Sequence, residues 1–289
     1  MALALAETTG GVVINADSAQ IYRDLPILSA APGEEELGRA EHRLYGVADG
    51  AAAMSAADWA VLARSEIGEA HAAGRLPILV GGTGMYLRTL IDGIAPVPSI
   101  DPAIRAAVRA ADVAANRKRL VELDPEAAAR IGPADTARIA RALEVMLSTG
   151  RPLKAWQAER SGGIGQSIDL RPLILLPPRD WLYARCDARF AAMVEAGAVD
   201  EVRRLLGRGL APPLPIMRAI GVREMTLFIA NSVSFADAIS AGQQATRNYA
   251  KRQYTWFAHQ PPKEWTRFRD PIDGPVAIEP ALELLRARA

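Results

Sequence analysis

Cysteine is almost missing from this 289-residue sequence, which contains only Cys186. One thiol cannot form an internal disulfide, and it cannot build a site that needs several Cys ligands. The three histidines, His42, His71 and His259, are scattered and have no cysteine nearby. The paired spacing that is typical of zinc sites therefore does not occur.

Long apolar runs and a strong net charge are also missing. The longest apolar stretches, such as Leu173–Leu176, are interrupted by Pro, Arg or Asp within a few residues, so no membrane span is predicted. The segment Met1–Glu7 has no basic region of the kind that opens a signal peptide. The net charge of +1 decides little, because nucleic-acid binding depends on local clusters of Lys and Arg. We expect a cytoplasmic protein.

Strands, loops and helices alternate in the first hundred residues. Gly11–Asn15 and Pro77–Val80 have the apolar, partly β-branched composition of buried strands, and Ala57–Ala73 has helical spacing of its apolar positions. This alternation predicts an α/β fold with a parallel sheet. Ligands bind beyond the carboxyl ends of such strands, so Asn15–Gln20 and Gly81–Tyr86 should face one cleft.

After about residue 100 the pattern becomes helical throughout. Asp-Pro pairs at positions 101 and 124 are typical helix starts, and Gly150 suits a helix end. A strand returns at Arg171–Pro177, so the helical piece is interpreted as an insertion. The predicted domains are an α/β core over 1–98, a helical insertion over 99–165 and the rest of the core with C-terminal helices over 166–289.

Two loop segments carry candidate chemistry. Asp17 follows the first predicted strand, where a carboxylate serves as a general base, a magnesium ligand or a turn cap. Gly81–Gly84 contains three glycines and Thr83, so it either cradles a ligand with its backbone amides or forms a plain tight turn.

Arginine pairs are the second kind of candidate. Arg185 and Arg189 lie four residues apart, so they either form a solvated stripe or point into the cleft. Arg218 and Arg223 bracket a glycine turn, which suits a phosphate clamp or two surface residues around an apolar segment.

A longer basic stripe is predicted on the helix near the C-terminus. Arg247, Lys251 and Tyr254 fall at helical spacing, which is typical of a phosphate-binding surface and also of a solvated face.

The phosphate-binding pattern Gly-x-x-x-x-Gly-Lys-Ser/Thr does not occur in the sequence. Gly162–Ser167 contains glycines, but it has no lysine and follows no predicted strand.

Seven short segments occur in an order that is known from one family. They are Ile14–Arg23, His42–Gly46, Leu79–Leu87, Arg138–Val145, Arg189–Phe190, Ala219–Glu224 and Ala250–Trp256. Together they resemble the tRNA dimethylallyltransferase (tRNA isopentenyltransferase) family. Any one segment is a weak signal, but seven in order across the chain are a strong one.

The resemblance implies a fold and a reaction. The implied fold is a P-loop NTPase-like parallel sheet core with a helical insertion that grips the anticodon arm of tRNA. The implied reaction transfers a dimethylallyl group from dimethylallyl diphosphate to N6 of adenine 37, with Mg²⁺ accompanying the diphosphate. The resemblance implies that Asp17 is the general base and that Thr83 contacts the extruded nucleotide. It also implies that Arg189 and Arg223 bind the diphosphate. A monomer is expected.

The resemblance also implies a set of tRNA contacts. They are Asp17, Ser18, Ala19, Gln20, Thr83, Arg105, Ala137, Arg138, Ile139, Ala140, Arg141, Arg218, Ala219, Ile220, Gly221, Val222, Arg223, Lys251, Arg252, Gln253 and Thr255. Two of these depart from the family's usual residues, since Ala137 stands where glutamine is common and Val222 where tyrosine is common.

A larger departure concerns the start of the sequence. Family members begin with a strand and a Gly-Lys-Ser/Thr phosphate loop before a helix rich in alanine and leucine, and Ala2–Glu7 resembles that helix. We therefore expect the first strand and the P-loop to be absent here and the native start to lie upstream. Two alternatives remain open, a catalytically dead tRNA-binding remnant and a P-loop small-molecule kinase.

Overall fold

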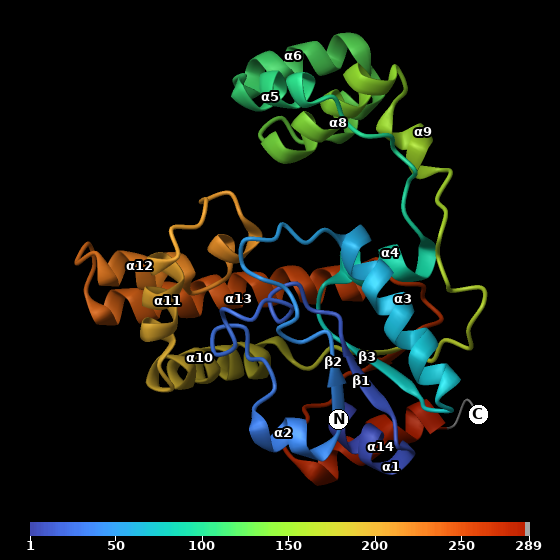
Figure 1. The fold of residues 1–289 in the computed structure, drawn as a ribbon, viewed down its shortest axis with the longest axis vertical. Helices are drawn as coiled ribbons and strands as arrows, with labels where there is room; N and C mark the ends of the chain where they lie inside the picture. Colours follow the sequence, from blue (N-terminus) through green and yellow to red (C-terminus); the bar gives the residue numbers. More distant parts are fainter. Residues whose placement is uncertain (287–289) are drawn as a thin grey trace. The chain divides into compact units, whose positions relative to one another are not determined.

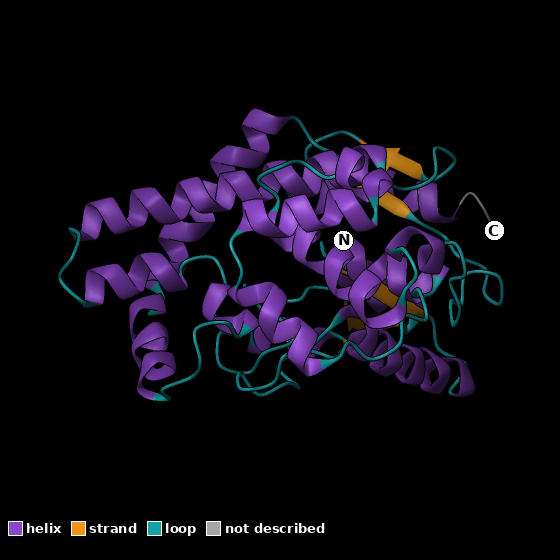
Figure 2. Ribbon diagram, turned by 90° about the horizontal axis from the view of Figure 1, so that it is seen from above, coloured by secondary structure: helices purple, strands orange, loops and turns teal. Residues whose placement is uncertain are grey.

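The computed structural model describes residues 1–286, which form two compact units. The first unit combines Met1–Arg88 with the chain from Ile168 onward, and the second is Thr89–Ser167. Helices make up most of both units, and the strands are short (Figures 1 and 2). Within residues 1–286, no helix is both long and apolar enough to cross a membrane.

A parallel sheet of β2 (Glu41–Arg43), β1 (Val12–Asn15) and β3 (Pro77–Val80), in that order, carries the candidate loops of the first unit. The two predicted strands are confirmed as β1 and β3, whereas β2 was not predicted, because three polar residues give no strand signal. Asn15 pairs with Val80 at the carboxyl ends of β1 and β3. The loops that follow these strands therefore leave the sheet side by side.

Helices cover both faces of this sheet. Val13 and Ile78 pack with α1 (Ala2–Thr9). Successive residues of a strand point to opposite faces, so the neighbours of Val13 and Ile78 face the other side. There the predicted helix, α3 (Ala56–Ala72), contacts β1 and β3.

The strand predicted within Arg171–Pro177 is β4 (Leu173–Leu175), but it does not extend the first sheet. It pairs in parallel with β5 (Thr266–Phe268), which sequence reasoning missed because it is three residues long with a charged centre. The described strands of the core thus form two separate parallel sheets. The terminal helix α14 (Pro275–Arg286) follows β5.

Helices and short turns complete the first unit. They are α2 (Glu34–Arg39), α4 (Gly84–Asp92, which continues into the second unit), α10 (Arg179–Glu195), α11 (Ala198–Gly207), the 3-10 turn η1 (Pro215–Arg218), α12 (Val222–Ile229) and α13 (Phe235–His259). The long helices α10 and α13 run side by side (Figure 1). A glycine allows this close approach, because a Cβ on Gly242 would lie 2.1 Å from the Phe190 ring.

The second unit is helical, as expected. Its helices are α5 (Pro102–Ala110), α6 (Val113–Leu123), α7 (Pro125–Arg130), α8 (Thr136–Thr149) and α9 (Leu153–Gln157). The aspartates at 101, 112, 124 and 135 cap the first four through backbone N–H groups, and Gly150 ends α8 with φ 68°. Asp101, Asp124 and Gly150 therefore have their predicted roles.

Leu120, Ile139 and Leu143 are fully buried in the core of the second unit. The predicted insertion, 99–165, lies wholly inside this unit. The proposed domain limits and the expected upstream strand and phosphate loop stay predictions.

Candidate functional site

The turn after β1 is held by Asn15, which is fully buried. Its Nδ2 donates to the carbonyls of Leu44 (2.9 Å) and Asp17 (3.0 Å), and its Oδ1 accepts from the Asp17 N–H at 2.7 Å. The Trp59 indole donates to the Asn15 carbonyl at 2.8 Å. Oδ1 of Asp17 accepts from the Ala19 N–H at 2.8 Å, so this carboxylate does cap the turn.

The loop after β3 lies directly against that turn. Thr83 donates its N–H to the Ala16 carbonyl at 3.2 Å, and its hydroxyl accepts from the Ser18 N–H at 2.9 Å. A Cβ on Gly81 would lie 2.2 Å from the Ala16 carbonyl carbon, and one on Gly82 would lie 2.0 Å from the Gln253 amide. Close packing therefore accounts for these two glycines. The predicted meeting of the two loops is confirmed.

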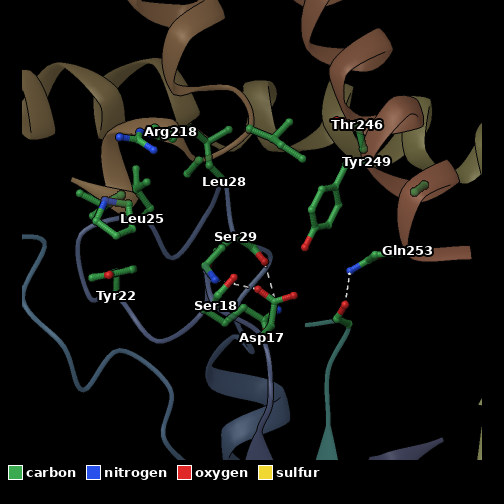
Figure 3. Close-up of a pocket in the computed structure, with 18 of the residues that line it drawn as sticks. Asp17, Ser18, Tyr22, Leu25, Leu28, Ser29, Arg218, Thr246, Tyr249 and Gln253 are labelled. Carbon is green, nitrogen blue, oxygen red and sulfur yellow. Dashed lines mark hydrogen bonds between the residues drawn. The ribbon is translucent and has the colours of Figure 1, made fainter. Parts of the chain in front are cut away.

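Both loops border a cavity of about 530 Å³ in the first unit (Figure 3). Its wall also contains residues of the 22–29 loop, α10, the segment around η1, and α13. The lining residues are Asp17, Ser18, Ala19, Gln20, Tyr22, Leu25, Leu28, Ser29, Met54, Gly82, Tyr86, Cys186, Arg189, Phe190, Met193, Pro215, Ile216, Arg218, Ala219, Ile220, Thr246, Tyr249, Ala250, Arg252 and Gln253.

The cavity combines one carboxylate with several cations and an apolar wall. Asp17 is its only lining Asp or Glu among the described residues, whereas Arg189, Arg218 and Arg252 supply three guanidinium groups. An excess of positive charge suits an anionic ligand such as a diphosphate. Much of the remaining wall is aliphatic or aromatic, which suits a small apolar group.

The cavity brings together only part of the predicted site. Predicted residues that line it are Asp17, Ser18, Ala19, Gln20, Arg189, Arg218, Ala219, Ile220, Arg252 and Gln253. Thr83 reaches it through Ser18. Predicted residues of the first unit that do not line it are Gly221, Val222, Arg223, Lys251 and Thr255. Arg105 and Ala137–Arg141 belong to the second unit.

Two residues of the predicted RNA-contact set have buried side chains. Ile139 is fully buried in the core of the second unit, and Val222 is 1% exposed at the start of α12. Their side chains are enclosed by protein because apolar groups at these positions fill the interior. Arg223 is exposed and lies outside the cavity wall, so the predicted Arg218–Arg223 clamp does not converge there.

The two arginines of the predicted pair on α10 have different surroundings. Arg189 lines the cavity, whereas Arg185 stacks over Trp181 at 4.9 Å and lies 3.7 Å from an Asp273 oxygen. Arg189 therefore fits the interpretation as a cavity residue, and Arg185 fits the interpretation as a solvated surface residue.

The basic stripe predicted on α13 is not a continuous free surface. Arg247 pairs with Asp187 of α10 at 2.5 Å, and Tyr254 packs under Arg179 at 4.9 Å. Lys251 is exposed and remains available to a ligand.

Tyr249 is a cavity residue that sequence reasoning missed. Figure 3 shows its side chain reaching from α13 with the hydroxyl directed toward the loop of Asp17. Burial raises the pKa of Tyr249, the Asp17 charge raises it further, and hydrogen bonds with Gln253 and Thr83 oppose the rise. The phenol thus stays protonated beside the carboxylate. Tyr249 lies between Arg247 and Lys251 on α13, and nothing in the sequence around it indicates this role.

Glu201 was also missed, although it supports the cavity wall. The carboxylate is 1% exposed and accepts from the N–H groups of Ile27 (2.7 Å) and Leu28 (2.9 Å). Gln20 holds the same loop by donating to the carbonyls of Ser29 and Ala30. Burial raises the pKa of Glu201, and the two backbone hydrogen bonds lower it less strongly.

No group of three His, Cys, Asp or Glu side chains within residues 1–286 could hold a metal ion. Asp17 is a single carboxylate, which does not form a protein cage for Mg²⁺. A Mg²⁺ ion that is bound mainly by a substrate's phosphates and water needs no such cage.

A family model described as IPP transferase matches residues 20–260. This chain belongs to the IPP transferase family. The match spans most of the chain, and the predicted family is therefore confirmed.

Curated relatives support the assignment over nearly the whole length. The chain is 56% identical to the tRNA dimethylallyltransferase of Sphingopyxis alaskensis, covering 98% of this chain and 93% of that protein. It is 59% identical to the tRNA dimethylallyltransferase of Novosphingobium aromaticivorans, covering 95% and 97%.

Solved structures show the same fold. The full-length tRNA isopentenylpyrophosphate transferase of Bacillus halodurans is 33% identical, with a TM-score of 0.68 over 99% of this chain and 92% of that one. A eukaryotic dimethylallyltransferase, described as acting on tRNA, has a TM-score of 0.77 over 98% and 80% at 24% identity. The fold is therefore a mixed α/β fold of this family with small parallel sheets.

Proposed function

We propose that this protein transfers the dimethylallyl group of dimethylallyl diphosphate to N6 of adenine 37 in tRNA. The observation that carries the proposal is the cavity whose lining combines Asp17, three arginines and an apolar wall. Its relatives, which are 56% and 59% identical, are tRNA dimethylallyltransferases.

The proposed reaction assigns a task to each part of the cavity. A neutral adenine amine is a weak nucleophile, so a positioned carboxylate that takes its proton assists attack. We assign this base to Asp17. The new bond joins N6 to C1 of the dimethylallyl group as the bond from C1 to the diphosphate oxygen breaks. The diphosphate leaves with the bonding electrons, and we assign the stabilisation of this charge to Arg189, which lines the cavity.

The remaining predicted residues would hold the RNA. The target adenine must leave the stacked anticodon loop before it can enter a cavity. Ser18–Gln20, Arg218–Ile220, Arg252 and Gln253 border the cavity and would contact the extruded nucleotide. Thr83 would support them through its hydrogen bonds to Ser18.

Magnesium is proposed only as a companion of the diphosphate. The ion would neutralise phosphate charge while Asp17 contributes at most one protein ligand. The tasks of Asp17 and Arg189 do not depend on it.

A transfer assay tests the function. The full chain is incubated with radiolabelled dimethylallyl diphosphate, Mg²⁺ and an unmodified tRNA that carries adenine at position 37, and a second tRNA with guanine there is the control. Label should enter only the adenine-containing tRNA.

Two other outcomes would reject the proposal. RNA binding with no transfer would support the tRNA-binding remnant, and phosphate transfer from ATP to a small molecule would support the kinase.

A further inference from the structure

A basic face lies on the second unit, between α5 and α8. Arg105 and Arg109 are one turn apart on α5, which packs against α8, where Arg141 lies. Burial lowers the pKa of Arg141, Glu144 opposes this, and the charges of Arg105 and Arg109 lower it further. The three guanidinium groups are therefore close enough to repel one another.

A buried carboxylate lies under this basic face. The Glu144 side chain is 1% exposed, and the other buried residues of α8 are apolar. Oε1 accepts from Nε of Arg109 at 2.9 Å, and Oε2 lies 4.0 Å from Nη1 of Arg141. A buried carboxylate carries a large desolvation cost, which such pairing offsets.

The pairing of Glu144 is incomplete. Within residues 1–286, its Oε2 has no hydrogen-bond partner, and a buried polar atom of this kind usually has one. Arg109 uses Nε toward Glu144, while its side chain is 66% exposed. This arrangement fixes the base of the guanidinium and leaves its outer edge toward solvent.

Two arginines flank the one carboxylate, and the charge of Arg105 acts on Arg141, so the face as a whole keeps a net attraction for anions. The outer edge of a fixed guanidinium matches the geometry of a phosphate. Repulsion among the arginines would also be relieved by an anion placed between them.

We propose that Arg109 and Arg141, positioned by the buried carboxylate of Glu144, bind one phosphate of the tRNA backbone. Arg109 and Glu144 lie outside the contacts that the family resemblance implies. The inference rests on the proposed function, since it names a further part of the same RNA-binding surface. Arg109 is the contact residue, and Glu144 is a positioning residue.

Salt-dependent RNA binding tests the contact. The Kd of the full chain for an anticodon stem-loop RNA is measured over a series of salt concentrations. Arg109→Ala should raise the Kd about tenfold and reduce the slope of log Kd against log salt by roughly one, the loss of one phosphate contact. Arg119→Ala, which removes the same charge from an exposed position on α6, is the matched control and should keep the slope.

Glu144→Gln separates positioning from charge. Removing a negative charge would by itself tighten RNA binding, whereas the neutral Gln oxygen accepts a weaker hydrogen bond from Arg109 and holds its guanidinium less firmly. We expect a higher Kd, and Arg109→Ala/Glu144→Gln should bind no more weakly than Arg109→Ala alone. Thermal unfolding monitors the fold, and Arg109→Ala remains decisive if Glu144→Gln is unstable, because Arg109 is exposed.

Three results would overturn the inference. They are an unchanged slope in Arg109→Ala, an equal loss of slope in Arg119→Ala, and tighter RNA binding by Glu144→Gln. Transfer activity keeps this failure distinct from failure of the proposed function. If wild type modifies tRNA while Arg109→Ala binds normally, only the inference fails, and if wild type neither binds nor modifies tRNA, the function fails.

Discussion

The two units build their candidate surfaces in different ways. The cavity of the first unit joins Asp17, Gly82, Arg189 and Gln253, which are separated by up to 236 positions in the sequence (253 − 17). The basic face of the second unit comes from two helices that lie within residues 102–149. A site built from residues far apart in the sequence depends on packing contacts across the whole first unit, whereas the basic face depends on the packing of one helix pair.

The largest expected effect lies at the chemical centre of the first unit. Asp17→Asn keeps the size of the side chain but removes the proposed base, so kcat should fall by about 10²- to 10⁴-fold. The RNA Kd should stay within about twofold of wild type, because the contacts on the second unit are untouched. Single-turnover transfer and RNA binding are measured on the same preparation. Normal transfer by Asp17→Asn would remove Asp17 from the reaction.

A second expected effect concerns the close packing of α10 and α13. Gly242→Ala places a Cβ 2.1 Å from the Phe190 ring, so the free energy of unfolding should fall by about 1–3 kcal/mol. Transfer should fall too, since Phe190 lines the cavity. Gly68→Ala in α3 meets nothing within 4 Å and should instead stabilise by about 0.4–1 kcal/mol. Urea unfolding measures both, and equal effects would contradict the packing argument.

The second unit offers a comparable local test. Asn116 is buried and donates to the Val108 carbonyl at 2.7 Å, near the end of α5. Asn116→Ala leaves that carbonyl without this donor, at a cost of about 1–3 kcal/mol to folding. We expect weaker RNA binding, because α5 carries Arg109, with kcat unchanged at saturating tRNA. A fall in kcat that saturating tRNA does not restore would show that the two surfaces are not separable.

The smallest expected effect is a pH dependence that belongs to the first unit. Burial raises the pKa of Glu201 in the folded protein, so the folded state binds the carboxyl proton of Glu201 more tightly than the unfolded state does. The protonated Glu201 side chain makes its full contribution to the free energy of unfolding at low pH, and this contribution is lost as the pH rises through the raised pKa. Glu201→Gln should therefore flatten the decline in unfolding free energy above about pH 4.5. Urea titrations across pH compare the two proteins, and parallel curves would argue against this assignment.

Sequence reasoning predicted the parts of the site that are local. The strands β1 and β3, the meeting of their loops and the caps Asp101 and Asp124 follow from short patterns of residues. The position of Asp17 follows from the rule for parallel sheets.

What failed depended on distant partners. Glu201 lies in an amphipathic helix, and nothing near it in sequence shows that it would accept from Ile27 and Leu28. The stripe of Arg247 and Tyr254 was correctly placed on one helix, but its occupation by Asp187 and Arg179 is visible only in three dimensions.

The single cysteine, Cys186, allows access to the cavity to be measured by chemical labelling. Cys186 lines the wall, and burial raises the pKa of its thiol, so slow alkylation by a small reagent is expected. Because no second cysteine occurs in the sequence, every labelled molecule reports on this one position. The rate of labelling would then follow how often the cavity is open, and a bound substrate would be seen as protection without any engineered probe.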